Sequence, residues 1–194
     1  MEKNDIEIFK IIQSLAQDLK IITFLELGGC DAYHTKLLTK LIGNNLKQYY
    51  VVEANPELWN RFKDVPVTLI KEAINDYDGT CDFWLSNSRY SGSSSIREPL
   101  EHIKVWPECT FDKKITIDCL KLDTIKSKYD IGIIDFIWSD IQGAEINAIL
   151  GGEKLLSSTR YFYTETAAQE FYKGQMIKKD FLDALIIIHM QSGR

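Results

Sequence analysis

The sequence predicts an α/β fold built on a doubly wound, mostly parallel sheet. Apolar runs at 21–27, 49–53 and 131–139 have the composition of strands that are buried on both faces. Segments with helical spacing of apolar residues lie between these runs, and alternating strands and helices are typical of parallel sheets. The chain has no internal repeat, so we expect one domain over residues 1–194.

The first elements can be placed in order. Apolar residues at helical spacing within 1–20 indicate a leading amphipathic helix. The strand at 21–27 follows and ends in two glycines. A helix is then expected over Tyr33–Ile42, with Asp31 placed to cap its start and Gly43 to end it.

The next elements continue the alternation. After the strand at 49–53, Asn55-Pro56-Glu57 predicts the start of a short helix that runs to Phe62, because it combines an N-cap, a first-turn proline and an acid. A third strand is expected at 66–70.

The middle of the chain is less regular. Strands are expected at 81–85 and 114–119. Between them, 86–110 forms a long surface loop region that begins with a serine-rich stretch. A short connector is expected at 122–125.

The C-terminal part adds a helix over 143–150, a strand at 160–164 and a helix over 179–185. Only Ile186–Met190 remains for a further strand, so we expect the sheet to be incomplete on that side. An uncovered sheet edge recruits partners. A homo-oligomer formed through this edge is therefore one expectation.

Composition excludes several classes of protein. Lys and Arg number 23 against 28 Asp and Glu, a net charge of −5, which disfavours nucleic-acid binding. The four cysteines form no CxxC pair, so a zinc site is disfavoured and a cytoplasmic location is expected. The acidic start is unlike a signal peptide, and no apolar run is long enough to cross a membrane.

Acids gather where the expected strands end. In doubly wound sheets, ligands bind at the carboxyl ends of the strands. The positions to consider are Glu26–Asp31, Glu53–Asn55, Ala73–Asp76, Asp140–Gln142 and Glu165, and four of these five places hold an acid at or next to the strand end. This acidic edge is the most informative feature of the sequence.

The first turn does not fit a dinucleotide. A pyrophosphate-binding turn needs glycines at its first, third and sixth places, which here hold Gly28, Cys30 and Tyr33. Glu26 and Asp31 would also repel phosphates. NAD and FAD are therefore disfavoured.

A cationic cofactor fits the acids better. S-adenosylmethionine carries a sulfonium, an ammonium and a ribose but no phosphate, and Glu53 lies about where an acid takes ribose hydroxyls. The structural alternative is a tight glycine turn with Glu26 and Glu53 as solvated strand ends.

Four segments carry a family resemblance. They are Phe24–Thr35, Val51–Glu57, Ala73–Gly79 and Ile134–Glu145, and Asp140-x-Gln-Gly-Ala-Glu145 is the most specific. These segments resemble the FkbM-type S-adenosylmethionine-dependent methyltransferases. The resemblance runs from about residue 20 to about residue 175. It implies a class I methyltransferase fold, which is Rossmann-like, and methylation of a hydroxyl on a small molecule or glycan.

The resemblance also implies roles for individual residues. Glu26 and the two glycines would line the methionine end of the cofactor, Glu53 would take the ribose hydroxyls, and Ala73 and Ile74 would border the adenine. Ser93–Ser95 resembles the serine-containing loop of the family. The cofactor-binding residues expected are Glu26, Gly28, Gly29, Asp31, Glu53, Ala54, Ala73, Ile74 and Asp140.

Asp140 and Glu165 are the catalytic candidates. A hydroxyl acceptor must lose a proton, so a nearby carboxylate helps. The pair could share that role or hold a divalent cation that orients a diol, although no metal set is evident. The alternatives are that Asp140 only caps the next helix and that Glu165 is a solvated strand end. Glu145 is expected to be a first-turn acid.

Other side chains carry weaker hypotheses. His34 and His102 are minor candidates for a base. Trp84, Tyr90, Trp106 and Trp138 could stack on a sugar, although core packing is the better interpretation for Trp84 and Trp138.

Two departures from the family keep a second function open. Family members often have Asn in place of Cys30 and Gly in place of Ala32, and alanine lacks the freedom of glycine at positive φ. The family also usually continues into a closing strand pair. The alternative is a catalytically weakened cofactor-binding module.

Overall fold

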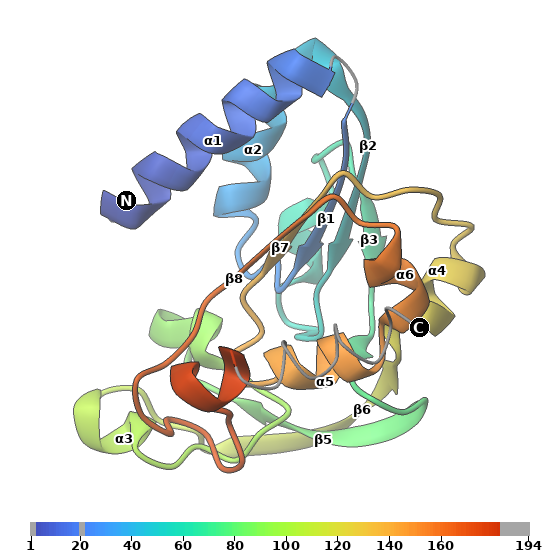
Figure 1. Ribbon diagram of the computed structural model, residues 1–194. Helices are drawn as coiled ribbons and strands as arrows, with labels where there is room; N and C mark the ends of the chain where they lie inside the picture. Colours follow the sequence, from blue (N-terminus) through green and yellow to red (C-terminus); the bar gives the residue numbers. More distant parts are fainter. Residues whose placement is uncertain (1–2, 20–21, 183–194) are drawn as a thin grey trace.

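A computed structural model describes residues 3–19 and 22–182. Its centre is a five-stranded parallel sheet in the order β3-β2-β1-β7-β8 (Figure 1). The strands are β1 (Ile22–Leu27), β2 (Leu46–Val52), β3 (Thr68–Ile70), β7 (Phe136–Ser139) and β8 (Tyr161–Thr164). The prediction of a doubly wound α/β fold is confirmed.

The three apolar runs lie side by side, as predicted. β1 is central, with Phe24 opposite both Tyr49 of β2 and Phe136 of β7. The third run is strand only from Phe136 onward, although Ile131 and Ile134 before it are buried. Burial in the core, rather than strand pairing, therefore explains the apolar start of this run.

Helices cover both faces of the sheet. α1 (Lys3–Leu19) and α2 (Tyr33–Ile42) pack on one face, while α4 (Leu122–Lys128) and α6 (Glu153–Ser157) lie on the other (Figure 1). α5 (Glu145–Leu150) crosses near the carboxyl ends of the strands. Because side chains alternate between the two faces of a strand, the strands contribute apolar residues to the core on each face of the sheet.

A second sheet, which the sequence did not predict as a separate unit, lies at the carboxyl ends of the first. It has the order β4-β6-β5, with β4 (Ala73–Ile74) parallel and β5 (Gly79–Leu85) antiparallel to β6 (Lys113–Leu120) (Figure 1). The strands expected at 81–85 and 114–119 are confirmed. The second sheet therefore faces the carboxyl ends of the strands of the main sheet.

The shorter elements differ in detail from the sequence predictions. The helix expected after Asn55 is a turn followed by the 3-10 helix Trp59–Phe62, although Asn55 Oδ1 does accept the Glu57 N–H at 3.0 Å. The connector expected at 122–125 is the start of α4. The long loop region contains a 3-10 helix, Ser88–Ser93, and the short helix α3 (His102–Val105).

The C-terminal predictions are only partly covered. Residues 178–182 are helical, as expected for the last helix. Ile186–Met190 lies outside the described residues, so the incomplete sheet and the homo-oligomer through its edge stay predictions. No helix in the described part of the chain is both long and apolar enough to span a membrane.

Candidate functional site

A cavity of about 270 Å³ opens at the carboxyl ends of β1, β2, β4 and β7, and we call it the strand-end cavity. Every residue that the sequence predicted for cofactor binding lines it. These are Glu26, Gly28, Gly29, Asp31, Glu53, Ala54, Ala73, Ile74 and Asp140. The serine-rich loop adds Ser91, Gly92 and Ser94–Ile96 to the lining.

The glycine turn is packed against the neighbouring strands. A Cβ on Gly28, whose φ is +88°, would lie 2.0 Å from the backbone oxygen of Asp140. A Cβ on Gly29 would lie 2.4 Å from Val51 Cγ1. Both glycines are therefore needed for β1 to turn closely over the ends of β2 and β7.

The two departures from the family pattern both have positive φ. Cys30 has φ +48° and Ala32, the fully buried N-cap of α2, has φ +64°. Left-handed backbone costs a residue other than glycine roughly 1–2 kcal/mol, and asparagine tolerates it better than most. Ala32 thus adopts a conformation that glycine would reach without strain.

Glu53 is a buried, oriented carboxylate. Its Oε1 accepts the Asn55 N–H and its Oε2 accepts the Cys30 N–H, both at 2.6 Å. Burial raises the pKa of Glu53 to about 7, which the two backbone hydrogen bonds oppose and the nearby Asp140 reinforces. The alternative of a solvated strand end is wrong for this residue, which is only 5% exposed.

Glu26 is buried more completely, at 1% exposure, so it is not a solvated strand end either. Its Oε2 accepts hydrogen bonds from Thr35 Oγ1 at 2.6 Å and from the Tyr49 hydroxyl at 2.8 Å. Burial raises the pKa of Glu26 to about 8. Below that pH its carboxyl group is largely protonated. Binding of a cation next to it would favour the charged form.

Asp31 has a local structural role at the rim of the cavity. Its Oδ1 accepts the Tyr33 N–H at 3.0 Å, at the start of α2. Asp31 therefore helps to begin this helix, as expected, although the formal N-cap residue is Ala32.

Asp140 stands at the end of β7, where its N–H donates to the Leu27 carbonyl at 2.9 Å. It is not the N-cap of the next helix, because that position in α5 is held by Ala144. Glu145 Oε1 instead accepts the N–H groups of Ile141 at 3.3 Å and Gly143 at 3.2 Å. Glu145 is the first-turn acid that was expected, and the capping interpretation of Asp140 is wrong.

A second cavity, of about 340 Å³, shares Asp140 and Gln142 with the first, and we call it the loop cavity. Glu165 lines this cavity and not the strand-end cavity, so the two catalytic candidates face the same space. Aromatic rings make up much of its wall: Tyr90, His102, Trp106, Phe171 and Tyr172.

Gln142 connects the two cavities. The sequence placed it among the strand-end positions but predicted no role for it. Its Nε2 donates to Asp140 Oδ1, and its Oε1 accepts the Tyr172 hydroxyl at 3.0 Å. Ser95 Oγ donates to the backbone oxygen of Gln142 at 2.7 Å, and the φ angle of Gln142 is +50°. Strained backbone often marks functional sites. The signal in the sequence was its place inside the most specific family segment.

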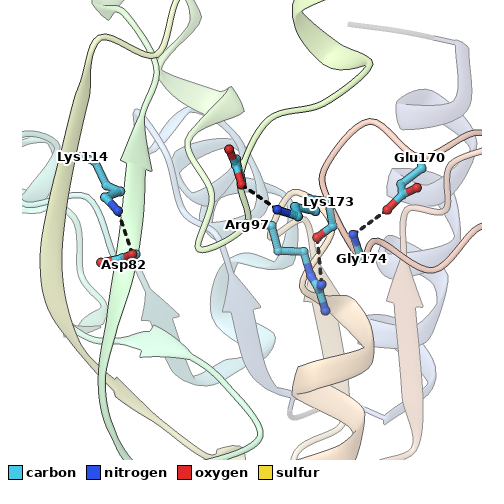
Figure 2. Close-up of polar contacts among 7 residues, drawn as sticks. Asp82, Arg97, Lys114, Glu170, Lys173 and Gly174 are labelled. Atoms are coloured by element: carbon cyan, nitrogen blue, oxygen red, sulfur yellow. Dashed lines mark hydrogen bonds and ion pairs between the residues drawn. The ribbon is translucent and has the colours of Figure 1, made fainter.

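The loop that carries Tyr172 is tied to the segment before α3. Lys173 Nζ pairs with Glu98 at 3.2 Å, and Arg97 Nη1 donates to the Lys173 carbonyl at 3.2 Å (Figure 2). Glu170 accepts the Gly174 N–H within the same loop. These contacts brace the outer wall of the loop cavity.

The core-packing interpretation is confirmed for Trp138 and wrong for Trp84. Trp138 is 3% exposed and stacks on Phe9 with 5.7 Å between ring centroids, so it belongs to the core. Trp84 is half-buried on β5, where Lys114 Nζ lies 5.0 Å from its ring centroid. Figure 2 shows Lys114 paired with Asp82. Lys114 is not among the lining residues of either cavity. Of the four aromatic residues considered for stacking on a sugar, Trp106 and Tyr90 line the loop cavity.

Among the described residues, no group of three or more His, Cys, Asp and Glu side chains is arranged to hold a metal ion. His34 lines the strand-end cavity and His102 the loop cavity.

Comparison with known proteins now places the chain in a family. The model of the methyltransferase FkbM domain matches residues 26–190. The chain belongs to the FkbM methyltransferase family. This segment includes the glycine turn, Glu53, Asp140 and the walls of both cavities.

A curated relative and a solved structure are also similar to this FkbM-family chain. It is 38% identical over 122 residues to a protein named 2-O-methyltransferase NoeI from Sinorhizobium fredii, which covers 60% of this chain and 50% of the relative. The chain therefore matches about half the length of that relative. A crystal structure of methyltransferase FkbM from Methylobacillus flagellatus KT superposes on this chain with a TM-score of 0.53 and 13% sequence identity. The match covers 87% of this chain and 37% of the FkbM chain, and it supports the fold.

Proposed function

We propose that this protein is an S-adenosylmethionine-dependent O-methyltransferase acting on a hydroxyl of a small molecule or glycan. The observation that carries the proposal is that two cavities meet at Asp140, and one of them is lined by the residues that the family resemblance predicts for cofactor binding. The other would take the acceptor. Family membership and the relative named as a 2-O-methyltransferase support it.

The chemistry of the strand-end cavity suits a cation better than a phosphate. Its described lining includes Glu26, Asp31, Glu53, Glu72 and Asp140, with no lysine or arginine. A dinucleotide would bring two phosphates into this acidic space, whereas S-adenosylmethionine has no phosphate and carries a sulfonium and an ammonium against one carboxylate, a net charge of +1. The residues present therefore fit this cofactor.

Each group in the cavity has a part in that proposal. S-adenosylmethionine, when bound, supplies an electrophilic methyl group on a sulfonium. Glu53, held by two backbone N–H groups, still has lone pairs to accept ribose hydroxyls. Glu26 would attract the ammonium, and Ala73 and Ile74 would border the adenine.

Asp140 would orient the acceptor hydroxyl and accept its proton. It is the acid that lines both cavities, and Gln142 fixes one of its carboxylate oxygens. Glu165 lines only the loop cavity, where it would contact the acceptor or assist in proton transfer. Positioning of the hydroxyl supplies the rest of the rate enhancement.

Two measurements test the proposal. Calorimetric titration should show binding of S-adenosylmethionine and none of NAD. Incubation with an acceptor library should produce S-adenosylhomocysteine. Binding without turnover on any acceptor would favour the alternative, a catalytically weakened cofactor-binding module, for which the left-handed Cys30 and Ala32 would be the first residues to restore to Asn and Gly.

A further inference from the structure

We infer that the loop cavity takes an uncharged, polyhydroxylated ring, such as a sugar unit within a neutral glycoside, and rejects phosphorylated and nucleotide-activated sugars. The inference rests on the proposed function, because it names the acceptor class for the same site. It is carried by the aromatic walls of the cavity, the sign of the charges in its described lining and a buried imidazole nitrogen that has no partner among the described residues.

The aromatic walls offer faces to a ring-shaped ligand. Trp106 is 41% exposed, and its ring centroid lies 5.2 Å from that of Phe171 and 4.8 Å from that of His102. An exposed indole at the rim of a cavity presents apolar surface to the C–H face of a sugar. The cavity volume of about 340 Å³ suits a small-molecule site.

The charges around the cavity have one sign. Asp140, Glu145 and Glu165 line it, and its described lining contains no lysine or arginine. A phosphate group entering this space would meet these carboxylates at close range, and no lysine or arginine of the described lining would face it. Phosphate sites in proteins normally supply such cations or helix N-termini.

Two neighbouring guanidinium groups do not fill that role. Arg97 donates to Asn147 Oδ1 and to the Lys173 carbonyl, and it is not among the lining residues although its charge acts on Glu145. Arg89 lies over the ring of Tyr90, 5.5 Å from its centroid, and is not among the lining residues. Both cations are adjacent to the walls and outside the cavity.

His102 adds a polar group that a hydroxyl can satisfy. It is 5% exposed, it lines the cavity, and its Nδ1 has no hydrogen-bond partner among the residues that the structure describes. Burial lowers the pKa of His102, so the imidazole is neutral near pH 7 and attracts no anion. A ligand hydroxyl would complete its hydrogen bonding.

This selectivity places methylation after the chemistry that removes phosphate. A nucleotide-activated sugar carries its diphosphate directly on the ring, so it would put two or more negative charges next to the three carboxylates. A glycosyl transfer, which releases the nucleotide, must then supply the acceptor. The methylated product is a neutral ether that needs no further charge compensation.

A matched binding experiment tests the inference. Methyl glycosides of several hexoses and deoxyhexoses, and the corresponding sugar 1-phosphates, are titrated in the presence of saturating S-adenosylhomocysteine. Saturation-transfer NMR gives the affinities. At least one methyl glycoside should bind, and the 1-phosphate of the same sugar should bind at least about tenfold more weakly.

Variants of the cavity make the test sharper. Glu165→Lys should reduce the preference for the neutral ligand at least threefold, while Glu165→Gln should change it less. Trp106→Ala should weaken glycoside binding at least fivefold and leave S-adenosylhomocysteine affinity unchanged, which also shows that the variant is folded.

The outcomes separate the two proposals. If S-adenosylhomocysteine itself does not bind, the proposed function fails. If it binds but the phosphates bind as tightly as the glycosides, or no glycoside binds, the inference about the acceptor is overturned and the proposed function stands.

Discussion

The strand-end cavity and the loop cavity share Asp140 and Gln142, yet they are built in different ways. The first is lined mainly by residues that directly follow strands, so their positions depend on the sheet and its parallel pairing. The second is walled by 90–106 and 165–175, which come together only through loop contacts such as Tyr172 to Ser93 at 2.7 Å.

This difference indicates which part of the fold would determine cofactor binding and which would determine acceptor specificity. A sheet edge positions backbone and acids in the same way whenever the strands pair, which suits a fixed cofactor. Loops can change without disturbing the sheet, which suits a variable acceptor. Substitutions in one cavity should therefore affect one ligand and spare the other, with the shared residues as exceptions.

The largest effect is expected at the shared acid. Asp140→Asn should lower turnover by roughly 10²–10⁴ while cofactor affinity stays within a few-fold, because the amide cannot accept the acceptor's proton. Steady-state kinetics and calorimetry measure the two quantities. Asp118→Asn, on the exposed side of β6, is the control. Turnover like that of the unmodified protein would remove Asp140 from the mechanism.

The buried acids of the strand-end cavity predict a pH dependence of stability. The pKa values of Glu26, about 8, and Glu53, about 7, lie above the ordinary 4.5, so the folded state binds more protons than the unfolded state between pH 4.5 and 8. The free energy of unfolding of the ligand-free protein should therefore fall as the pH rises through this window.

Replacing Glu26 removes the larger part of this dependence. In Glu26→Gln, the loss of stability between pH 5 and pH 8.5 should shrink by on the order of 3 kcal/mol, because the side chain at position 26 no longer titrates. Denaturant unfolding at a series of pH values measures it. Equal slopes in both proteins would show that Glu26 is already charged in the folded state.

Cofactor affinity should depend on the oriented carboxylate. Glu53→Ala should weaken S-adenosylmethionine binding by at least about tenfold, since charged hydrogen bonds typically contribute about 1.5–3 kcal/mol each. Glu57→Ala, an exposed acid nearby, is the matched control. Unchanged affinity in a folded Glu53 variant would contradict the ribose assignment.

The smallest effect concerns the connection between the cavities. Tyr172→Phe removes the hydroxyl that holds Gln142 Oε1, so Gln142 should fix Asp140 less firmly and turnover should fall about three- to tenfold. Cofactor affinity should not change. Tyr161→Phe, on the exposed edge strand β8, should leave both unaffected. A loss of cofactor affinity in Tyr172→Phe would mean that the two cavities are not separable.

Much of this arrangement was predictable because it depends on short-range pattern. Buried β-rich runs, the glycine turn and the acids after each strand are local features, and parallel pairing brings all strand ends to one edge. Gly28 had to be glycine because its neighbour across the sheet is the backbone of Asp140.

The second sheet, the roles of Gln142 and Tyr172 and the aromatic wall were decided by tertiary structure alone. Ser93 and Tyr172 are 79 positions apart, and Gln142 contacts both Ser95 and Tyr172 through side-chain hydroxyls. No spacing along the chain encodes such contacts, because loop paths depend on packing against elements far away in sequence. The sequence alone determined the fold class and the acids at the strand ends, because both follow from local periodicity. Only the tertiary structure determined how deeply those acids are buried and which cavity each one faces.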